Sequence, residues 1–131
     1  MGATEPQLAD PLPNILREWA EWWMRQESLG YPESTTLWLM QLGSGRQEFK
    51  SSIPTGVSML EVRGALRRIV RAMDRLRADP DEEVWLPTLL VQCWYTSGPE
   101  AVRDVTGKSR ASLYQMLKIG ETLIRHEMKL K

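Results

Sequence analysis

Seven polar side chains near residue 110 have the types and the spacing needed to hydrogen-bond a nucleic acid. They lie within residues 108–118 and carry cationic, hydroxyl and amide groups: Lys108, Ser109, Arg110, Ser112, Tyr114, Gln115 and Lys118. Arginine and glutamine can form paired hydrogen bonds with base edges, and lysine and serine often bind phosphates. Such residues also occur on the exposed face of many helices, so the elements that position them must decide between the two interpretations.

Residues 98–128 indicate a short helix, a tight turn and a longer helix. Gly98-Pro99 can open the first helix, because proline at the first helical position loses no hydrogen bond, and Gly107 can end it. Ser109 can cap the second helix, whose apolar residues recur with a helical period: Leu113, Met116, Leu117, Ile119, Gly120, Leu123 and Ile124. This order predicts a DNA-binding helix-turn-helix, and an ordinary pair of antiparallel helices is the alternative.

Two residues beside the turn glycine depart from the usual helix-turn-helix pattern. Thr106 and Lys108 occupy positions where such turns usually carry apolar side chains. We therefore expect a looser core between the two helices, or a Lys108 side chain directed at a phosphate.

A row of arginines marks a second candidate contact surface. Ser58 and Glu61 form a capping box for a helix expected to end near Leu76. Arginines recur every four residues on its polar side, with one more beside them: Arg63, Arg67, Arg71, Arg75 and Arg68. Because only Glu61 and Asp74 can pair with them locally, we predict that the row binds phosphates or an acidic protein surface.

Tryptophans mark a third candidate surface. Trp19, Trp22 and Trp23 lie on one broad face of an expected helix, which favours a role in the core, with one of the three facing outward toward a partner. Residues 28–57 are rich in turn residues and predict an irregular insert that contains Trp38. We expect this insert either to order against a partner or to pack on its own core. Trp22, Trp23 and Trp38 are the candidate partner contacts.

The chain as a whole predicts an all-α fold. Its 131 residues are 42% hydrophobic, enough for a flexible N-terminus at 1–10 and one helical domain at 11–131. The run VWLPTLLVQCWY is apolar nearly all round, so it should form a central buried helix, kinked or delayed in its start by Pro87. Seventeen basic residues balance seventeen acidic ones, but the positive charge is concentrated in 61–79 and 99–131.

No residue set for catalysis or metal binding can be assembled from the sequence. His126 and Cys93 are the only histidine and cysteine, and no nucleophile triad or P-loop is present. We therefore expect no enzyme activity, cofactor, metal or small-molecule substrate, and a nuclease that uses scattered carboxylates is a remote alternative. Cys93 in an apolar run predicts a buried thiol in a reducing cytoplasm, and no membrane span or secretory signal is expected.

Two stretches resemble phage Q-type antitermination proteins. Residues 16–22 (LREWAEW), followed by 29–32 (LGYP) and 43–45 (GSG), resemble the N-terminal pattern of that family. Residues 107–110 (GKSR), with Leu113 and Gly120-Glu121 downstream, look like its helix-turn-helix, which is similar to region 4 of bacterial sigma factors. The resemblance covers about residues 14–127, and the zinc ligands of the lambda-type members are missing.

The resemblance implies a mechanism of transcription antitermination. Such a protein binds double-stranded DNA beside a promoter and loads onto bacterial RNA polymerase, with its sigma factor, at a downstream pause. It then narrows the RNA exit channel around nascent RNA so that terminator hairpins cannot form. A helix-turn-helix regulator that acts only at initiation is the alternative, and a helical adaptor that binds no nucleic acid is the third possibility.

Overall fold

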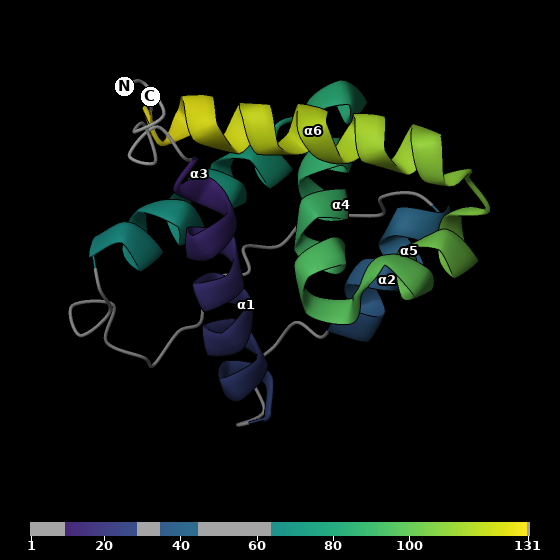
Figure 1. The fold of residues 1–131 in the computed structure, drawn as a ribbon, viewed down its shortest axis with the longest axis horizontal. Coiled ribbons are helices and arrows are strands. Elements are labelled where there is room, and N and C mark those ends of the chain that lie inside the picture. Colours follow the sequence, from purple (N-terminus) through teal and green to yellow (C-terminus); the bar gives the residue numbers. More distant parts are fainter. Residues whose placement is uncertain (1–9, 29–34, 45–63, 131) are drawn as a thin grey trace, which may run out of the picture.

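A computed structural model describes residues 10–28, 35–44 and 64–130 of the chain, and six helices occupy these ranges (Figure 1). They are α1 (Leu12–Ser28), α2 (Thr35–Ser44), α3 (Gly64–Ala78), α4 (Glu82–Ser97), α5 (Pro99–Thr106) and α6 (Arg110–Glu127). No strand occurs in these ranges, so the predicted all-α fold is confirmed. The capping box at Ser58 and Glu61, and Arg63, lie outside the described residues.

Helix α4 is the central buried helix, as its continuous apolar sequence predicts. All of its residues from 85 to 93 are buried except Leu86, which is half-buried: Trp85, Pro87, Thr88, Leu89, Leu90, Val91, Gln92 and Cys93. Asp81 caps the helix by accepting a hydrogen bond from the Glu83 backbone N–H at 2.9 Å. The expectation that Pro87 delays the start of the helix is wrong, because α4 begins at Glu82 and continues through Pro87. Pro87 lies near the helix start and removes a single backbone N–H there.

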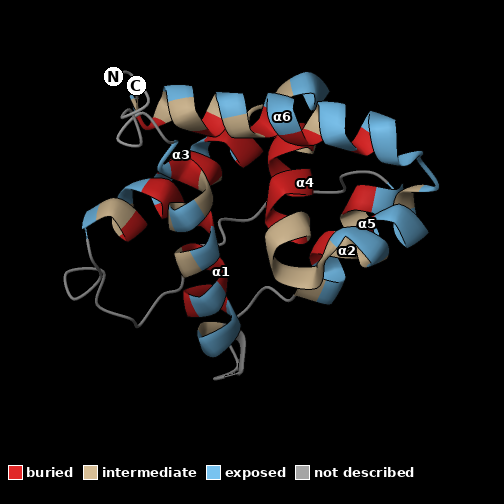
Figure 2. Ribbon diagram, in the orientation of Figure 1, coloured by how far each residue is buried: buried red, intermediate tan, exposed pale blue. Residues whose placement is uncertain are grey.

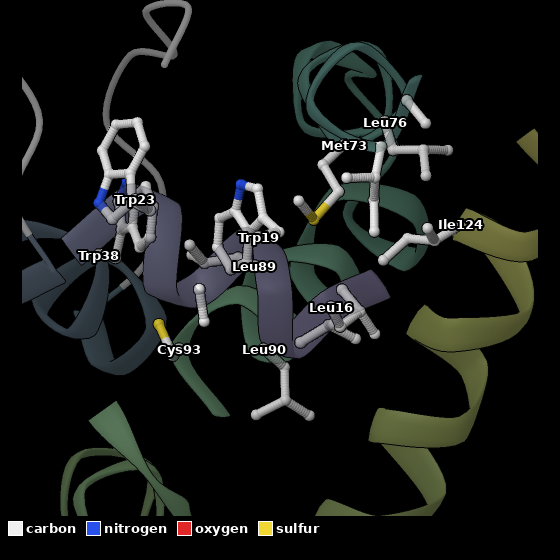
Figure 3. Packing of buried hydrophobic residues seen from close by; sticks show 14 of the residues in the cluster. Leu16, Trp19, Trp23, Trp38, Met73, Leu76, Leu89, Leu90, Cys93 and Ile124 are labelled. Atoms are coloured by element: carbon white, nitrogen blue, oxygen red, sulfur yellow. The ribbon is translucent and has the colours of Figure 1, made fainter. Parts of the chain in front are cut away.

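The Cys93 thiol lies in the second half of this helix, within the core shown in Figure 3, and is fully buried. Burial raises the pKa of the thiol to about 12, and the nearby Arg77 guanidinium lowers it by less. The thiol is therefore neutral at physiological pH and packs as a small apolar side chain, as the sequence predicts.

A stack of indole rings joins α1 to α2. The Trp38 ring lies between Trp19 and Trp23, with ring centroids 5.9 Å and 4.8 Å away and ring planes within 25° of parallel. Figure 3 shows Trp23 and Trp38 side by side at one end of the core. Trp22 is buried as well, so no tryptophan of α1 faces outward. The prediction that one of the three faces outward is therefore wrong, and Trp38 is buried as well. Contact of Trp22, Trp23 and Trp38 with a partner stays a prediction that this burial does not support.

Helix α2 corrects the prediction of an irregular insert at 28–57 in its described part, and residues 29–34 and 45–57 of that insert lie outside the described residues. Residues 35–44 form a helix whose buried residues are Trp38 and Leu42, and Ser28 belongs to α1. Helices α2 and α5 pack closely at Gly43, where an added Cβ would lie 2.7 Å from the Val105 carbonyl oxygen. Of the two alternatives for this segment, packing on the protein's own core is the one observed for α2.

Arg77 of α3 is a buried cation that the sequence analysis did not single out. Its side chain is 3% exposed and donates to Gln92 Oε1 at 3.1 Å and to Gln41 Oε1 at 3.0 Å. Its guanidinium carbon also lies 5.7 Å from the centre of the Trp38 ring. These contacts replace part of the hydration that a buried guanidinium loses, so Arg77 ties α3 to α2 and α4.

Helix α6 lies across α4 at Gly120 (Figure 1). A Cβ on Gly120 would lie 2.4 Å from the Pro87 carbonyl oxygen and 2.6 Å from Val91 Cγ2. No real side chain tolerates such distances, and the nearest atom belongs to the backbone and cannot rotate away. The two helix backbones therefore pack in direct contact, which only glycine permits at this point.

Replacing Gly120 by alanine should destabilise the protein. Alanine in a helix interior is more favourable than glycine by about 1 kcal/mol. The added methyl group would push α4 and α6 apart, which should cost more, so the free energy of unfolding should fall by about 1–3 kcal/mol in total. Urea unfolding followed by circular dichroism measures this change. Gly64→Ala is the matched control, because no atom lies within 4 Å of a Cβ there, and it should be neutral or stabilising. A Gly120→Ala variant as stable as the control would contradict the close crossing.

Candidate nucleic-acid interface

The turn between α5 and α6 follows the local chemistry that the sequence predicts. Pro99 is the first residue of α5, and Gly107 ends that helix in the left-handed conformation with φ 67°. Ser109 then caps α6, its hydroxyl oxygen accepting a hydrogen bond from the Ser112 N–H at 3.2 Å. A short helix, a tight turn and a longer helix are therefore present at the predicted residues, which fits both a DNA-binding motif and an ordinary pair of antiparallel helices.

Thr106 has a defined role in this turn. Its hydroxyl donates to the Val102 carbonyl at 2.8 Å and accepts from the Lys108 backbone N–H at 3.3 Å. The polar side chain thus closes the turn by hydrogen bonds where other turns use apolar contact. The Lys108 side chain is exposed, and Val102 is the buried residue of α5.

All seven candidate DNA-binding residues are exposed, and together they cover the turn and the first half of α6 (Figure 2). Leu113 and Leu117 point into the core from the same half of the helix. Because successive residues of a helix are rotated by about 100°, Gln115 and Lys118 share the face that points away from the core. The arrangement leaves this half of α6 free to contact a long surface such as the groove of a duplex.

Two candidates lie on opposite flanks of α6. Arg110 borders a small cavity of about 30 Å³ beside Arg103 and Glu100 of α5. Ser112 borders a larger groove beside Glu82 and Glu83 of α4. The α5 flank therefore carries two guanidinium groups and the Glu100 carboxylate, whereas the α4 flank carries two exposed carboxylates and Lys108. Phosphates should favour the α5 flank, where positive charge exceeds negative.

Tyr114 is packed as well as exposed. Its ring meets Trp94 of α4 edge to face, with centroids 5.4 Å apart and planes at 60°. The side chain is still 46% exposed. Tyr114 therefore has a fixed ring position from which it can contact a ligand with little loss of side-chain entropy.

The arginine row on α3 is partly used inside the protein. Arg75 Nε donates to Glu127 Oε2 of α6 at 2.7 Å, and Arg68 donates to the Met128 carbonyl oxygen. The prediction that the row lacks partners is wrong for these two, because a helix distant in sequence supplies them. Arg67 is half-buried, and Arg71 is exposed between Arg68 and Arg75.

These contacts fix the C-terminal end of α6. In the ion pair between Arg75 and Glu127, the Arg75 side chain is 58% exposed and the Glu127 side chain 33% exposed. Because solvent screens such a pair, it contributes at most about 1 kcal/mol to stability. Arg125 also pairs with Asp10 at the start of α1. Burial raises the pKa of the Asp10 carboxyl, but hydrogen bonds from Arg125 and the Leu12 N–H outweigh it and hold the pKa below its ordinary value.

Tyr95 makes a further polar link between α4 and α6. Its hydroxyl donates to Glu121 Oε2 at 3.0 Å, one residue after the Gly120 crossing. Burial, the Glu121 charge and this hydrogen bond all raise the pKa of Tyr95. Tyr95 therefore stays protonated and donates this bond at any physiological pH.

The described part of the chain holds no cluster of three or more potential metal-ligating side chains. None of its helices is long and apolar enough to cross a membrane. Comparisons with protein-family models, curated proteins and solved structures found no match to the chain. The resemblance to Q-type antitermination proteins therefore stays a prediction.

The two glycines that bound α5 should respond differently to substitution. A Cβ added at either position would have no atom within 4 Å, so only backbone conformation matters. Gly107, at φ 67° and ψ 13°, is in the left-handed helical region, where alanine should cost about 1–2 kcal/mol and asparagine less. Gly98, at φ 96° and ψ 162°, is in a region open essentially to glycine, so alanine and asparagine should both cost about 1–3 kcal/mol.

Urea unfolding of the four variants at these two positions measures the difference. Asparagine should recover stability relative to alanine at position 107 and not at position 98. Equal losses for Gly107→Ala and Gly107→Asn would contradict the left-handed turn.

Proposed function

We propose that this protein is a transcription antitermination factor that binds duplex DNA beside a promoter through the turn and the first half of α6. The observation that carries the DNA-binding part is the exposure of all seven polar residues at the start of one helix. They follow a turn closed by Gly107 and Ser109. A helix presented in this way can enter the major groove.

The exposed side chains supply both kinds of contact that a DNA site requires. Gln115 can pair with adenine and Arg110 with guanine, while Lys108 and Lys118 can bind phosphates. The N-terminus of α6 adds free backbone N–H groups and a partial positive charge, which also favour a phosphate. Arg103 on α5 strengthens the positive field on the Arg110 flank.

The antitermination part of the proposal depends on the resemblance in residues 16–22, 29–32, 43–45 and 107–110, with Leu113 and Gly120-Glu121. In this role the protein acts in the bacterial cytoplasm on the nucleoid, and its partners are RNA polymerase and nascent RNA. Since Trp22, Trp23 and Trp38 are buried, the remaining candidates for these contacts are the exposed arginines of α3, above all Arg71. A helix-turn-helix regulator acting at initiation is the second candidate, because the exposure of α6 supports it equally well.

Single-round transcription by bacterial RNA polymerase tests the proposal. The template carries the protein's own upstream promoter region and a distal terminator, and it is transcribed with and without the protein. We expect readthrough of the terminator to rise severalfold and to require the upstream DNA. Altered initiation without readthrough would favour the second candidate, and no effect on either step would contradict both.

A double variant, Arg110→Ala with Gln115→Ala, should abolish this readthrough together with site-specific DNA binding. Loss of two base contacts should weaken binding by about 10- to 100-fold or more. His126→Ala is the matched control, because His126 is exposed at the opposite end of the same helix. Unchanged DNA binding by the double variant would exclude this half of α6 as the DNA surface.

A further inference from the structure

The described residues form a groove of about 360 Å³ between the first half of α4 and the first half of α6. Four apolar side chains line it: Leu86, Pro87, Met116 and Ile119. Five polar residues complete the lining: Glu82, Glu83, Lys108, Ser112 and Gln115. The groove lies next to the close crossing at Gly120, where the backbones of the two helices are in direct contact.

Ile119 is unusual for an exposed helix position. It is 52% exposed, although isoleucine is among the residues most often buried. Ser112, Met116 and Ile119 are spaced by four and three residues, so they share the flank of α6 that faces α4. With half-buried Leu86 and Met116, Ile119 gives this flank a continuous apolar surface. Such a surface beside polar residues is typical of a protein interaction site.

The charge on the α4 side of the groove is negative. Glu82 and Glu83 are both exposed, and neither carboxylate has an ion pair within the described part of the chain. Among the described residues that line the groove, Lys108 is the one cation. Two carboxylates beside an apolar floor repel phosphates and attract lysine or arginine, so this flank of α6 is unsuited to DNA although the outward face is suited to it.

The exposure of the lining residues indicates the kind of occupant. Six of its nine lining residues are exposed, so it cannot enclose a small molecule as ligand pockets do. An open apolar groove between two helices instead accepts the side chains along one face of a third helix. We propose that the α4–α6 groove binds an amphipathic helix of another protein, with apolar residues at helical spacing over Met116 and Ile119 and with lysine or arginine beside Glu82 and Glu83.

This docking site borders the proposed DNA contact but does not depend on DNA binding. Lys108, Ser112 and Gln115 line the groove and are also candidate DNA contacts, so the two ligands would meet at these residues. The other candidate DNA contacts lie outside the groove lining: Ser109, Arg110, Tyr114 and Lys118.

A designed peptide tests the groove without knowledge of the natural partner. The probe is a fluorescein-labelled helical peptide of 15 residues with leucine at positions i, i+3, i+4 and i+7 and with lysine on its other face. The comparison peptide carries glutamate in place of lysine. Fluorescence anisotropy with the full-length protein at 0.15 M salt should show binding of the lysine peptide and at least tenfold weaker binding of the glutamate peptide.

Variants of the groove should weaken binding of the lysine peptide. Glu82→Gln with Glu83→Gln should weaken it about three- to tenfold, and Ile119→Ser about tenfold. The matched controls should leave it unchanged. Glu100→Gln removes an exposed carboxylate from the first turn of α5, and Met40→Ser removes an exposed apolar side chain from α2.

Three results would overturn the proposal: no binding of the lysine peptide, equal binding of both peptides, or equal effects of groove and control variants. Duplex DNA binding by the same proteins is measured in parallel. A wild-type protein that binds the peptide but no DNA would refute the proposed function and leave the groove intact. Loss of DNA binding in Ile119→Ser with unchanged peptide binding would assign this flank to nucleic acid and exclude the helix-docking role.

Discussion

The rest of the structure depends on the direct contact between the backbones of α4 and α6 at Gly120. Helix α4 is buried on almost every side, so it cannot shift without disturbing the packing of its neighbours. A Cβ at Gly120 would lie 2.4 Å from the Pro87 carbonyl oxygen. Only the absence of a side chain at Gly120 therefore lets α6 approach α4 this closely. The same contact determines the groove beside it and the direction in which the first half of α6 extends from the core.

The two halves of α6 differ in their contacts because their neighbours differ. At the C-terminal end, Arg68, Arg75 and Asp10 hold the helix to α3 and α1. At the N-terminal end, Leu113 and Leu117 anchor one face and leave the remaining faces exposed. The outward face is neutral to basic and the flank toward α4 is apolar and acidic, so one half-helix presents two chemically distinct surfaces.

Local chemistry could be predicted from the sequence, and long-range pairing could not. Gly107 and Ser109 bound the turn as expected, because the left-handed conformation and the N-cap depend on residues within one or two positions. Whether Trp38 packs on the core or contacts a partner could not be decided from the sequence, because its burial depends on α1. The partners of Arg75 and Arg77 were missed because they come from α6, α4 and α2. The groove was missed for the same reason, since α4 and α6 form it together.

The central claim is that the first half of α6 is a DNA-binding surface held in place by the crossing at Gly120. The most direct test is a titration of the ¹⁵N-labelled protein with a duplex from its own upstream promoter region, followed by NMR. We predict amide shift changes concentrated in residues 108–118 that weaken steeply as salt rises, because phosphate contacts release counterions. Shift changes confined to other helices, or none at low salt, would contradict the claim.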